Sequence, residues 1–293
     1  MLKNNDLPTS LVYFGTCAGV LQILKHKRLP LFRLPSLKDP FCPSPDLPMN
    51  FSKQDLFEGS VKSMTASILG KEAPRGNPNH PLQKAISRWR GEQRFSTEAE
   101  IRESLENLLP AMVEQTYALA TQIHREWQDF VNVKAILPLY KNHEDSLLWY
   151  TEGKKYSGVA IRFKSAEDGP LENCSSVDYS KTPNSTVSIK DTIDLLTGMI
   201  QEIPKEFETT LLRQNALFKS QKEWRLILDR DKPTDMYIEY PANLIQSIYI
   251  GPLVDSDKVQ QILDYSKLTY DKINVYKARA LDRVFELEFD KVN

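Results

Sequence analysis

Strand-forming segments at both ends of the chain enclose a long helical block, and this order constrains the fold most. β-Branched and alternating segments occur before residue 15 and return after residue 131, whereas residues 51–128 have helical character. Strands grouped around helices, rather than alternating with them one by one, predict an α+β fold with a mixed, mainly antiparallel sheet. We expect a single domain over residues 1–293, with residues 51–128 as a helical insertion.

The first 50 residues predict a strand, a helix and a loop. Residues 11–14 are β-branched or aromatic and predict a strand that ends at Gly15. Thr16 suits the N-cap of a helix that carries apolar residues at helical spacing and ends in the basic run 25–28. Residues 29–48 are punctuated by prolines, so a long loop is expected there.

The helical block predicts three helices, at 52–69, 81–90 and 96–127. Ser52 and Ser96 suit N-caps, and Pro81 suits a first turn. Pro110 is expected to kink or split the third helix. After the block, the pattern predicts strands at 131–140, 158–163, 177–179, 223–228, 236–240, 244–250, 273–276 and 284–289, and helices at 142–150, 189–218 (broken at Pro204) and 255–266. Gly158 is expected to permit close packing at a strand start.

Composition excludes several classes of protein. The 38 basic and 39 acidic residues leave a formal net charge of −1, which argues against a dedicated nucleic-acid or anionic-membrane binder. No apolar run reaches the ~18 residues of a membrane span, and the N-terminus has no apolar signal core. The three cysteines and four histidines lack zinc-ligand spacing. We therefore expect a cytoplasmic protein with reduced thiols, no metal and no membrane contact; its oligomeric state is not specified.

The stretch from Lys222 to Leu228 places two charged residues in a predicted strand. Glu223 and Arg225 flank Trp224, and residues two apart lie on the same face of a strand. Such a pair is either part of a functional site or a structural ion pair. Trp149 and Trp224 are expected to belong to the core, as large aromatic residues usually do.

Four landmarks, in this order, resemble the bacterial domain-of-unknown-function family numbered 2971. They cover most of the chain outside the helical block, and their order and spacing make the resemblance more specific than any one of them. The landmarks are Val12 to Thr16 with Val20 to Leu24 behind it, Leu37 to Phe41, Leu148-Trp149 followed by Gly158 to Phe163, and Lys222 to Arg225 followed by Ile245 to Gly251.

The opening of that family is in turn similar to ADP-ribosyltransferases, which bind NAD in a cleft between two small sheets. The resemblance implies that the core has such split sheets and that Glu223 is the catalytic carboxylate, which acts on the ribose hydroxyl and stabilises the oxocarbenium-like charge. It places Tyr13 and Thr16 beside the nicotinamide ribose. Asp39 or Arg225 would orient this neighbourhood. Tyr150 would replace a polar residue that the family carries in its Trp-Ser-His-Tyr segment and that this chain lacks. This is an analogy at the level of the fold.

Two functions follow from these observations. The first is an NAD-dependent ADP-ribosyltransferase or NAD glycohydrolase, acting as a toxin or phage-defence effector on a protein or RNA target. The second is a catalytically degenerate module that binds a partner protein or nucleic acid, which Phe14-Gly15 favours because the family tends to carry His-Tyr there. Neither a Walker motif nor a GxGxxG loop is present, which argues against kinases, GTPases and dinucleotide-fold dehydrogenases.

A basic helical face and His143 are two further candidates for a functional role. A helical face in the insertion could bind RNA or an acidic partner, although a solvated face is the commoner explanation. This face consists of Lys84, Arg88, Arg90 and Arg94 with Trp89. His143 precedes the predicted 142–150 helix segment around Trp149 and could reach the mouth of a cleft.

Overall fold

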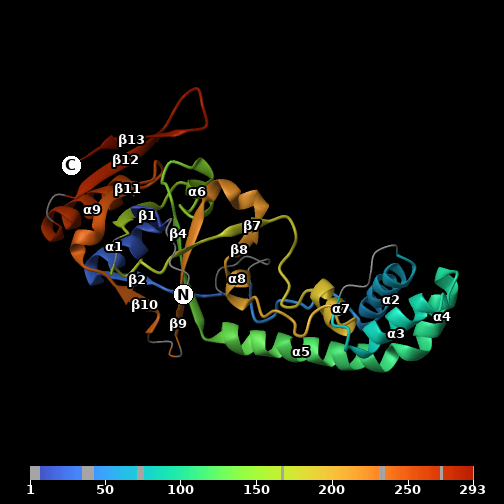
Figure 1. Ribbon diagram of the computed structural model, residues 1–293. Helices are drawn as coiled ribbons and strands as arrows, with labels where there is room; N and C mark the ends of the chain where they lie inside the picture. Colours follow the sequence, from blue (N-terminus) through green and yellow to red (C-terminus); the bar gives the residue numbers. More distant parts are fainter. Residues whose placement is uncertain are drawn as a thin grey trace. The chain divides into compact units, whose positions relative to one another are not determined.

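The computed structural model describes residues 7–34, 43–70, 76–165, 168–230, 232, 235–270 and 273–292 (Figure 1). The chain divides into two compact units. Unit 1 comprises Met1–Cys42, Val133–Pro183 and Leu212–Asn293, and unit 2 comprises Pro43–Asn132 and Asn184–Leu211. Residues 51–128, the predicted insertion, lie in unit 2 together with Asn184–Leu211.

Unit 1 is built on a large sheet, which holds nine strands among the described residues. They are β1 (Ser10–Gly15), β3 (Phe32–Arg33), β4 (Lys134–Tyr140), β5 (Val159–Lys164), β6 (Ser175–Ser176), β9 (Glu223–Asp229), β11 (Ile245–Ile250), β12 (Asn274–Ala280) and β13 (Leu287–Lys291). The order is β13-β12-β11-β5-β1-β4-β9-β6, with β3 beside β4. Every pair is antiparallel except β11 with β12, so the predicted α+β class with a mainly antiparallel sheet is confirmed.

The other described elements of unit 1 flank this sheet. They include helices α1 (Cys17–His26), α6 (Ser146–Thr151) and α9 (Ser256–Thr269). The 3-10 turn η2 (Ala216–Gln221) precedes β9, and the 3-10 turn η4 (Ala242–Leu244) precedes β11. Two strand pairs stand apart from the sheet: β2 (Arg28–Pro30) with β10 (Tyr237–Glu239), and β7 (Asp178–Ser180) with β8 (Arg213–Asn215). The β2 and β3 strands correct the expectation that residues 29–48 form only a loop.

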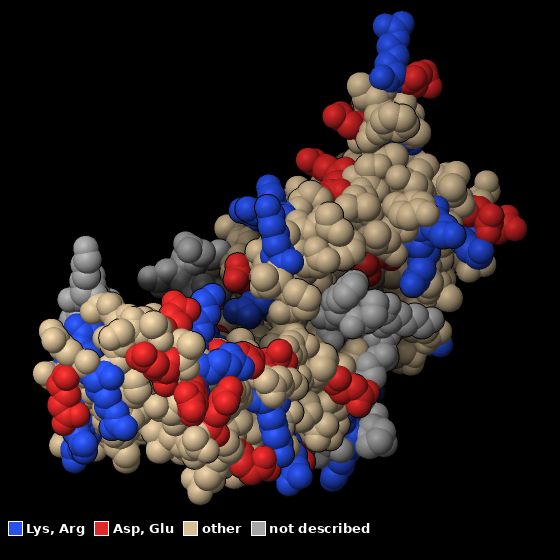
Figure 2. Space-filling model, turned by 90° about the vertical axis from the view of Figure 1, so that its right-hand side faces the viewer, with Lys and Arg blue, Asp and Glu red and all other residues tan. Residues whose placement is uncertain are grey.

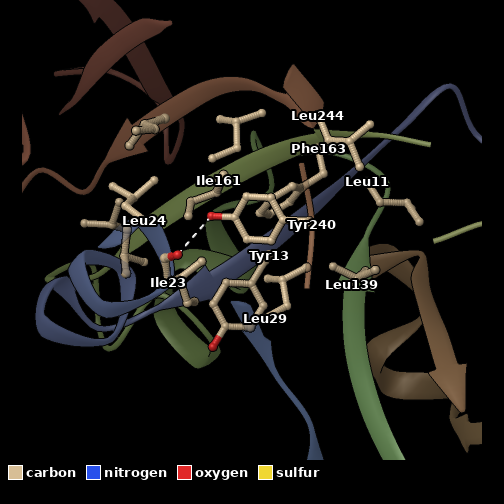
Figure 3. Close-up of a cluster of buried hydrophobic side chains, with 14 of the residues drawn as sticks. Leu11, Tyr13, Ile23, Leu24, Leu29, Leu139, Ile161, Phe163, Tyr240 and Leu244 are labelled. Carbon is tan, nitrogen blue, oxygen red and sulfur yellow. Dashed lines mark hydrogen bonds between the residues drawn. The ribbon is translucent and has the colours of Figure 1, made fainter. Parts of the chain in front are cut away.

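One face of the sheet packs against α1 and α9. Alternate residues of the strands point to this face, so Leu11, Ile161 and Phe163 meet the helices in a dry cluster (Figure 3). The hydroxyl of Tyr240 is buried there and donates to the Ile23 carbonyl at 3.0 Å. A buried hydroxyl needs such a partner, which fixes the end of α1 against the loop before β11.

The opposite face carries an aromatic cluster. Phe14 of β1 contacts the Trp149 ring edge to face at 5.1 Å, and Trp149 also lies 6.0 Å from Phe289 of β13. Trp149 is fully buried, and its indole N–H donates to the His143 carbonyl at 2.6 Å. Trp224 is buried in the cluster on the helix-covered face. The prediction that both tryptophans belong to the core is confirmed.

All the regular secondary structure described in unit 2 is helical. Its helices are α2 (Lys53–Leu69), α3 (Pro81–Gly91), α4 (Glu98–Leu108), α5 (Pro110–Asn132), α7 (Ile189–Leu196) and α8 (Phe207–Leu211). Ser52 caps α2 in a capping box with Asp55, and Pro81 begins α3, as predicted. Pro110 separates α4 from α5, which confirms the split. The cap of α4 is Thr97 rather than Ser96.

The prediction of a helix at 189–218 is wrong over most of its length. Gly198 has a φ of +77°, a left-handed conformation that suits glycine, and α7 ends just before it. Helix α8 covers only five residues, and the chain then enters β8, which pairs with β7. The strand predicted at 131–140 is also shorter, because α5 continues to Asn132 before β4 begins.

Gly158 lies where three backbone segments approach each other. A Cβ atom at this position would lie 2.7 Å from the Gly15 carbonyl oxygen and 2.8 Å from that of Gly153. Backbone atoms cannot move aside as a flexible side chain can. The expectation that Gly158 permits close packing is therefore confirmed.

We predict that Gly158→Ala lowers the free energy of unfolding by more than about 2 kcal/mol, because the added methyl group clashes with two carbonyls. Gly91→Ala is the matched control, since a Cβ there meets nothing within 4 Å. In a helix this control should be neutral or slightly stabilising. Urea unfolding followed by circular dichroism measures both. Equal effects of the two substitutions would contradict the packing argument.

Candidate functional site

The first residue of β9, Glu223, is placed by a sharp turn. Lys222 follows η2 with a φ of +50°, and this left-handed residue turns the chain into the strand. Glu223 is the strand partner of Tyr140, the last residue of β4, so both side chains lie on the same face of the sheet. The backbone N–H of Glu223 donates to the Tyr179 hydroxyl at 2.8 Å.

The Glu223 carboxylate is held by Arg225 in a buried ion pair. Nε of Arg225 lies 2.7 Å from Oε1 of Glu223, and Nη2 lies 3.2 Å from Oε2. The Arg225 side chain is only 2% exposed, and the Glu223 side chain is only 7% exposed. A planar guanidinium that contacts both oxygens fixes the orientation of the carboxylate as well as its position. Removal of either partner alone leaves a buried charge uncompensated, which is costly.

A second carboxylate, Glu152, lies close to the first. It follows α6 and is half-buried. Burial raises the pKa of the Glu152 carboxyl above its ordinary value, and the charge of Glu223 raises this pKa further. Lys154 and a hydrogen bond with Thr151 act in the opposite direction. Two neighbouring carboxyl groups thus differ in environment: Glu223 is paired with an arginine, and Glu152 holds its proton to a higher pH than an ordinary glutamate.

Two tyrosines, Tyr140 and Tyr179, lie near Glu223, and a third, Tyr13, lies near Glu152 from the helix-covered face of the sheet. Burial raises the pKa of Tyr140 well above its ordinary value, and the charges of Glu152 and Glu223 raise it further. Burial likewise raises the pKa of Tyr13 to about 12, with a contribution from Glu152. Burial is the main cause that raises the pKa of Tyr179, and the charge of Glu223 also raises it. The hydrogen bond from the Glu223 backbone N–H lowers this pKa in part. All three phenols therefore stay protonated near neutral pH and can donate hydrogen bonds.

The turn after Glu152 has an uncommon backbone. Lys154, Lys155 and Tyr156 have φ values of +51°, +54° and +68°. Each left-handed residue with a side chain costs roughly 1–2 kcal/mol. Backbone hydrogen bonds hold the turn, among them Tyr156 N–H to the Trp149 carbonyl at 2.9 Å. Strain of this kind persists where the surrounding structure enforces it, and it is concentrated at functional sites.

The predicted site residues are brought together only in part. Tyr13 and Glu223 both lie near Glu152: the charge of Glu152 raises the pKa of Tyr13, and the charge of Glu223 raises the pKa of Glu152. Figure 3 shows the Tyr13 hydroxyl pointing away from that of Tyr240 in the core. Thr16 is exposed and caps α1, where its Oγ accepts from Gly19 N–H at 3.0 Å. Its predicted capping role is confirmed.

The remaining predicted residues are Tyr150 and Asp39. Tyr150 is 51% exposed, and its ring contacts that of Tyr156. Asp39 lies outside the described residues. The assignment of Tyr13, Thr16, Asp39, Tyr150 and Arg225 to NAD binding stays a prediction.

Sequence reasoning missed Glu152, Tyr140 and Tyr179. Glu152 lies in the landmark segment that begins at Leu148, so its nearness to Trp149 was a usable signal. Tyr140 ends a predicted strand, but the pairing of β4 with β9 that brings it to Glu223 cannot be read from one sequence. Tyr179 lies in a two-stranded sheet whose second strand was predicted as helix.

Neither a metal cluster nor a membrane span is found in the part of the chain that the structure describes. No group of three or more His, Cys, Asp or Glu side chains there could hold a metal ion. No described helix is long and apolar enough to cross a bilayer. Comparison with known proteins gives no match to a family model, a curated protein or a solved structure.

We predict that Arg225→Met lowers the free energy of unfolding by roughly 3–5 kcal/mol near neutral pH, because it leaves the Glu223 carboxylate buried without its partner. Adding Glu223→Gln should recover part of that loss. Arg279→Met is the control, since Arg279 pairs with Glu288 and Asp290 on the surface and should lose less than about 1 kcal/mol. Urea unfolding of the four proteins measures this. Similar losses in Arg225→Met and Arg279→Met would show that the buried pair has no special weight.

Proposed function

We propose that this chain binds NAD and cleaves the bond between nicotinamide and ribose, with Glu223 as the catalytic carboxylate. In this reaction the C–N glycosidic bond breaks and nicotinamide leaves with its electron pair. A C–O bond then forms to water or to a nucleophile on a protein or RNA, which gives ADP-ribose or an ADP-ribosylated target. A toxin or phage-defence effector would use such a reaction.

The observation that carries the proposal is the meeting of two carboxylates, Glu223 and Glu152, with the neutral phenols of Tyr140 and Tyr179 at the start of β9. The ribose carbon becomes positively charged as nicotinamide departs, and fixed negative charge stabilises such a transition state. Arg225 orients Glu223, so the carboxylate needs little reorganisation during the reaction. The phenols of Tyr140 and Tyr179 are suited to hold ribose hydroxyls, and Tyr13 approaches Glu152 from the helix-covered face.

The resemblance to family 2971 and to ADP-ribosyltransferases supports the same assignment. It identifies a strand-start glutamate late in the chain, and Glu223 is the first residue of β9. The mainly antiparallel α+β sheet is compatible with that likeness. A split-sheet cleft of the ADP-ribosyltransferase kind is part of the proposal, in which the NAD ribose would lie beside the adjacent ends of β4 and β9.

A second function, a non-catalytic binding module, is favoured by one specific observation. Both carboxylate oxygens of Glu223 already accept hydrogen bonds from Arg225, and the residue is only 6% exposed. A carboxylate so fully engaged has the features of a structural ion pair. In this case a partner would bind elsewhere on the chain.

The basic helical face in unit 2 gives little support to nucleic acid as that partner. Arg88 pairs with Glu92 at 2.9 Å, and Arg90 donates to the Ser67 carbonyl. The Arg94 guanidinium lies over Trp89, 5.9 Å from the ring centroid. Figure 2 shows Lys and Arg interspersed with Asp and Glu on the face in view. This pattern is typical of a solvated surface.

We predict that the purified protein releases nicotinamide from NAD and that Glu223→Gln lowers the rate at least about 100-fold, because one oriented charge in the transition state is lost. Glu239→Gln is the matched control, since Glu239 is an exposed strand residue paired with Arg28, and it should keep the rate. Chromatography of the released nicotinamide gives the rates, and circular dichroism checks that each variant folds.

Equal release by the wild type and Glu223→Gln would remove Glu223 from the mechanism. If no variant releases nicotinamide, thermal stabilisation by NAD separates the two functions, because a ligand at 100 times its Kd adds about 2.7 kcal/mol. No activity together with no stabilisation at millimolar NAD would favour the binding module.

A further inference from the structure

Arg162 of β5 is a half-buried arginine without an acidic partner among the described residues. Its Nη2 lies 2.6 Å from Nδ1 of His143, a neutral group, and its guanidinium lies over the Tyr249 ring, 5.5 Å from the centroid. Its Nε is buried and makes no hydrogen bond. Two other arginines of the sheet, Arg225 and Arg279, are each paired with carboxylates.

His143 is locked against this arginine. Its ring stacks on Tyr249 at 3.7 Å and contacts Phe289 at 4.7 Å. Burial and, to a smaller extent, the charge of Arg162 together lower the pKa of His143 to about 3. The imidazole is therefore neutral at physiological pH. Since Nδ1 accepts from Arg162, the ring proton lies on Nε2, on the far side of the ring from the guanidinium. His143 therefore holds and orients Arg162 as a neutral acceptor.

Two hydroxyls complete the group. Ser247 of β11 is the strand partner of Arg162, so its side chain lies on the same face. Its Oγ donates to the Tyr249 hydroxyl at 3.0 Å, which leaves the phenol proton of Tyr249 free to be donated. The group thus combines one fixed positive charge with a neutral hydroxyl donor, and no acidic residue with a described contact to Arg162 offsets that charge.

A half-buried charge without a counter-charge is costly, so this arrangement has a physical reason to bind an anion. A guanidinium with unused N–H groups in a plane matches the oxygens of phosphate, and an additional hydroxyl donor suits a tetrahedral ion with several acceptors. Partial exposure of Arg162 leaves a route for the ligand from solvent.

We propose that Arg162, held in place by His143, and the Ser247–Tyr249 hydroxyl pair form a binding site for a phosphate group. This phosphate site is separate from the carboxylates around Glu223. Arg162, Val12, Tyr140 and Glu223 form one row of partners across four strands. The two ends of this row, Arg162 and Glu223, are three strand spacings apart, a distance of about 14 Å. The phosphate site does not depend on NAD cleavage.

The test is thermal unfolding of the full chain with increasing inorganic phosphate, and separately with AMP, against sodium chloride at the same ionic strength. We expect a saturable rise in Tm with phosphate for the wild type, and at least a tenfold weaker apparent affinity for Arg162→Gln. A larger effect of AMP would identify a phosphate ester as the better ligand, whereas equal effects would identify the phosphate alone as sufficient; both support the site.

The matched control is Arg279→Gln, an exposed arginine of the neighbouring sheet region, which should keep the wild-type response. Glu223→Gln should also keep it, so failure of the NAD proposal leaves this result intact. If Arg162→Gln does not fold, Arg162→Lys takes its place, because lysine keeps the charge but loses the planar fork. An absent response to both phosphate and AMP in the wild type, or an unchanged response when Arg162 is replaced, would overturn the proposal.

Discussion

The buried pair of Glu223 and Arg225 is the interaction on which the candidate active site depends. Both charges lie on one strand face, almost fully removed from solvent, at the point where β9 begins. A single buried carboxylate would lose its charge or destabilise the fold. Arg225 allows Glu223 to stay in place, and Glu223 in turn acts on Glu152 and the neighbouring phenols through its charge.

The geometry of the sheet explains why these groups meet although they are distant in sequence. The pairing of β4 with β9 puts Tyr140 beside Glu223. Glu152, the residue that ends α6, lies near Glu223 just before the left-handed turn at 154–156. The same face continues through Val12 to Arg162, where the charge is positive. One sheet face therefore carries a carboxylate group at β9 and a cationic group at β5, separated by the apolar width of β1 and the Tyr140 ring.

The sequence allowed the fold class and many local signals to be predicted. Thr16, Ser52 and Pro81 act at helix starts as their chemistry requires, and Pro110 splits the long helix. Such signals depend on a few adjacent residues. The helix expected at 189–218 failed because Gly198 and the pairing of β8 with β7 outweighed helical periodicity.

The candidate site was harder to predict than the fold. Glu223 and Arg225 were identified because they interrupt an apolar strand, and they form the pair that their spacing allows. Glu152, Tyr140 and Arg162 join their groups only through strand pairing and an uncommon turn, which one sequence does not reveal. The polar side chains with local signals were therefore found, and those placed by tertiary structure were missed.

The central claim is that Glu152 and Glu223 form one electrostatically coupled site, and NMR titration of the Glu152 carboxyl carbon tests it most directly. In the wild type, Glu152 should titrate above the ~4.3 of an unperturbed glutamate. In Glu223→Gln its pKa should fall, because a neighbouring negative charge is gone. An ordinary Glu152 pKa in the wild type, or the same pKa in both proteins, would contradict the account.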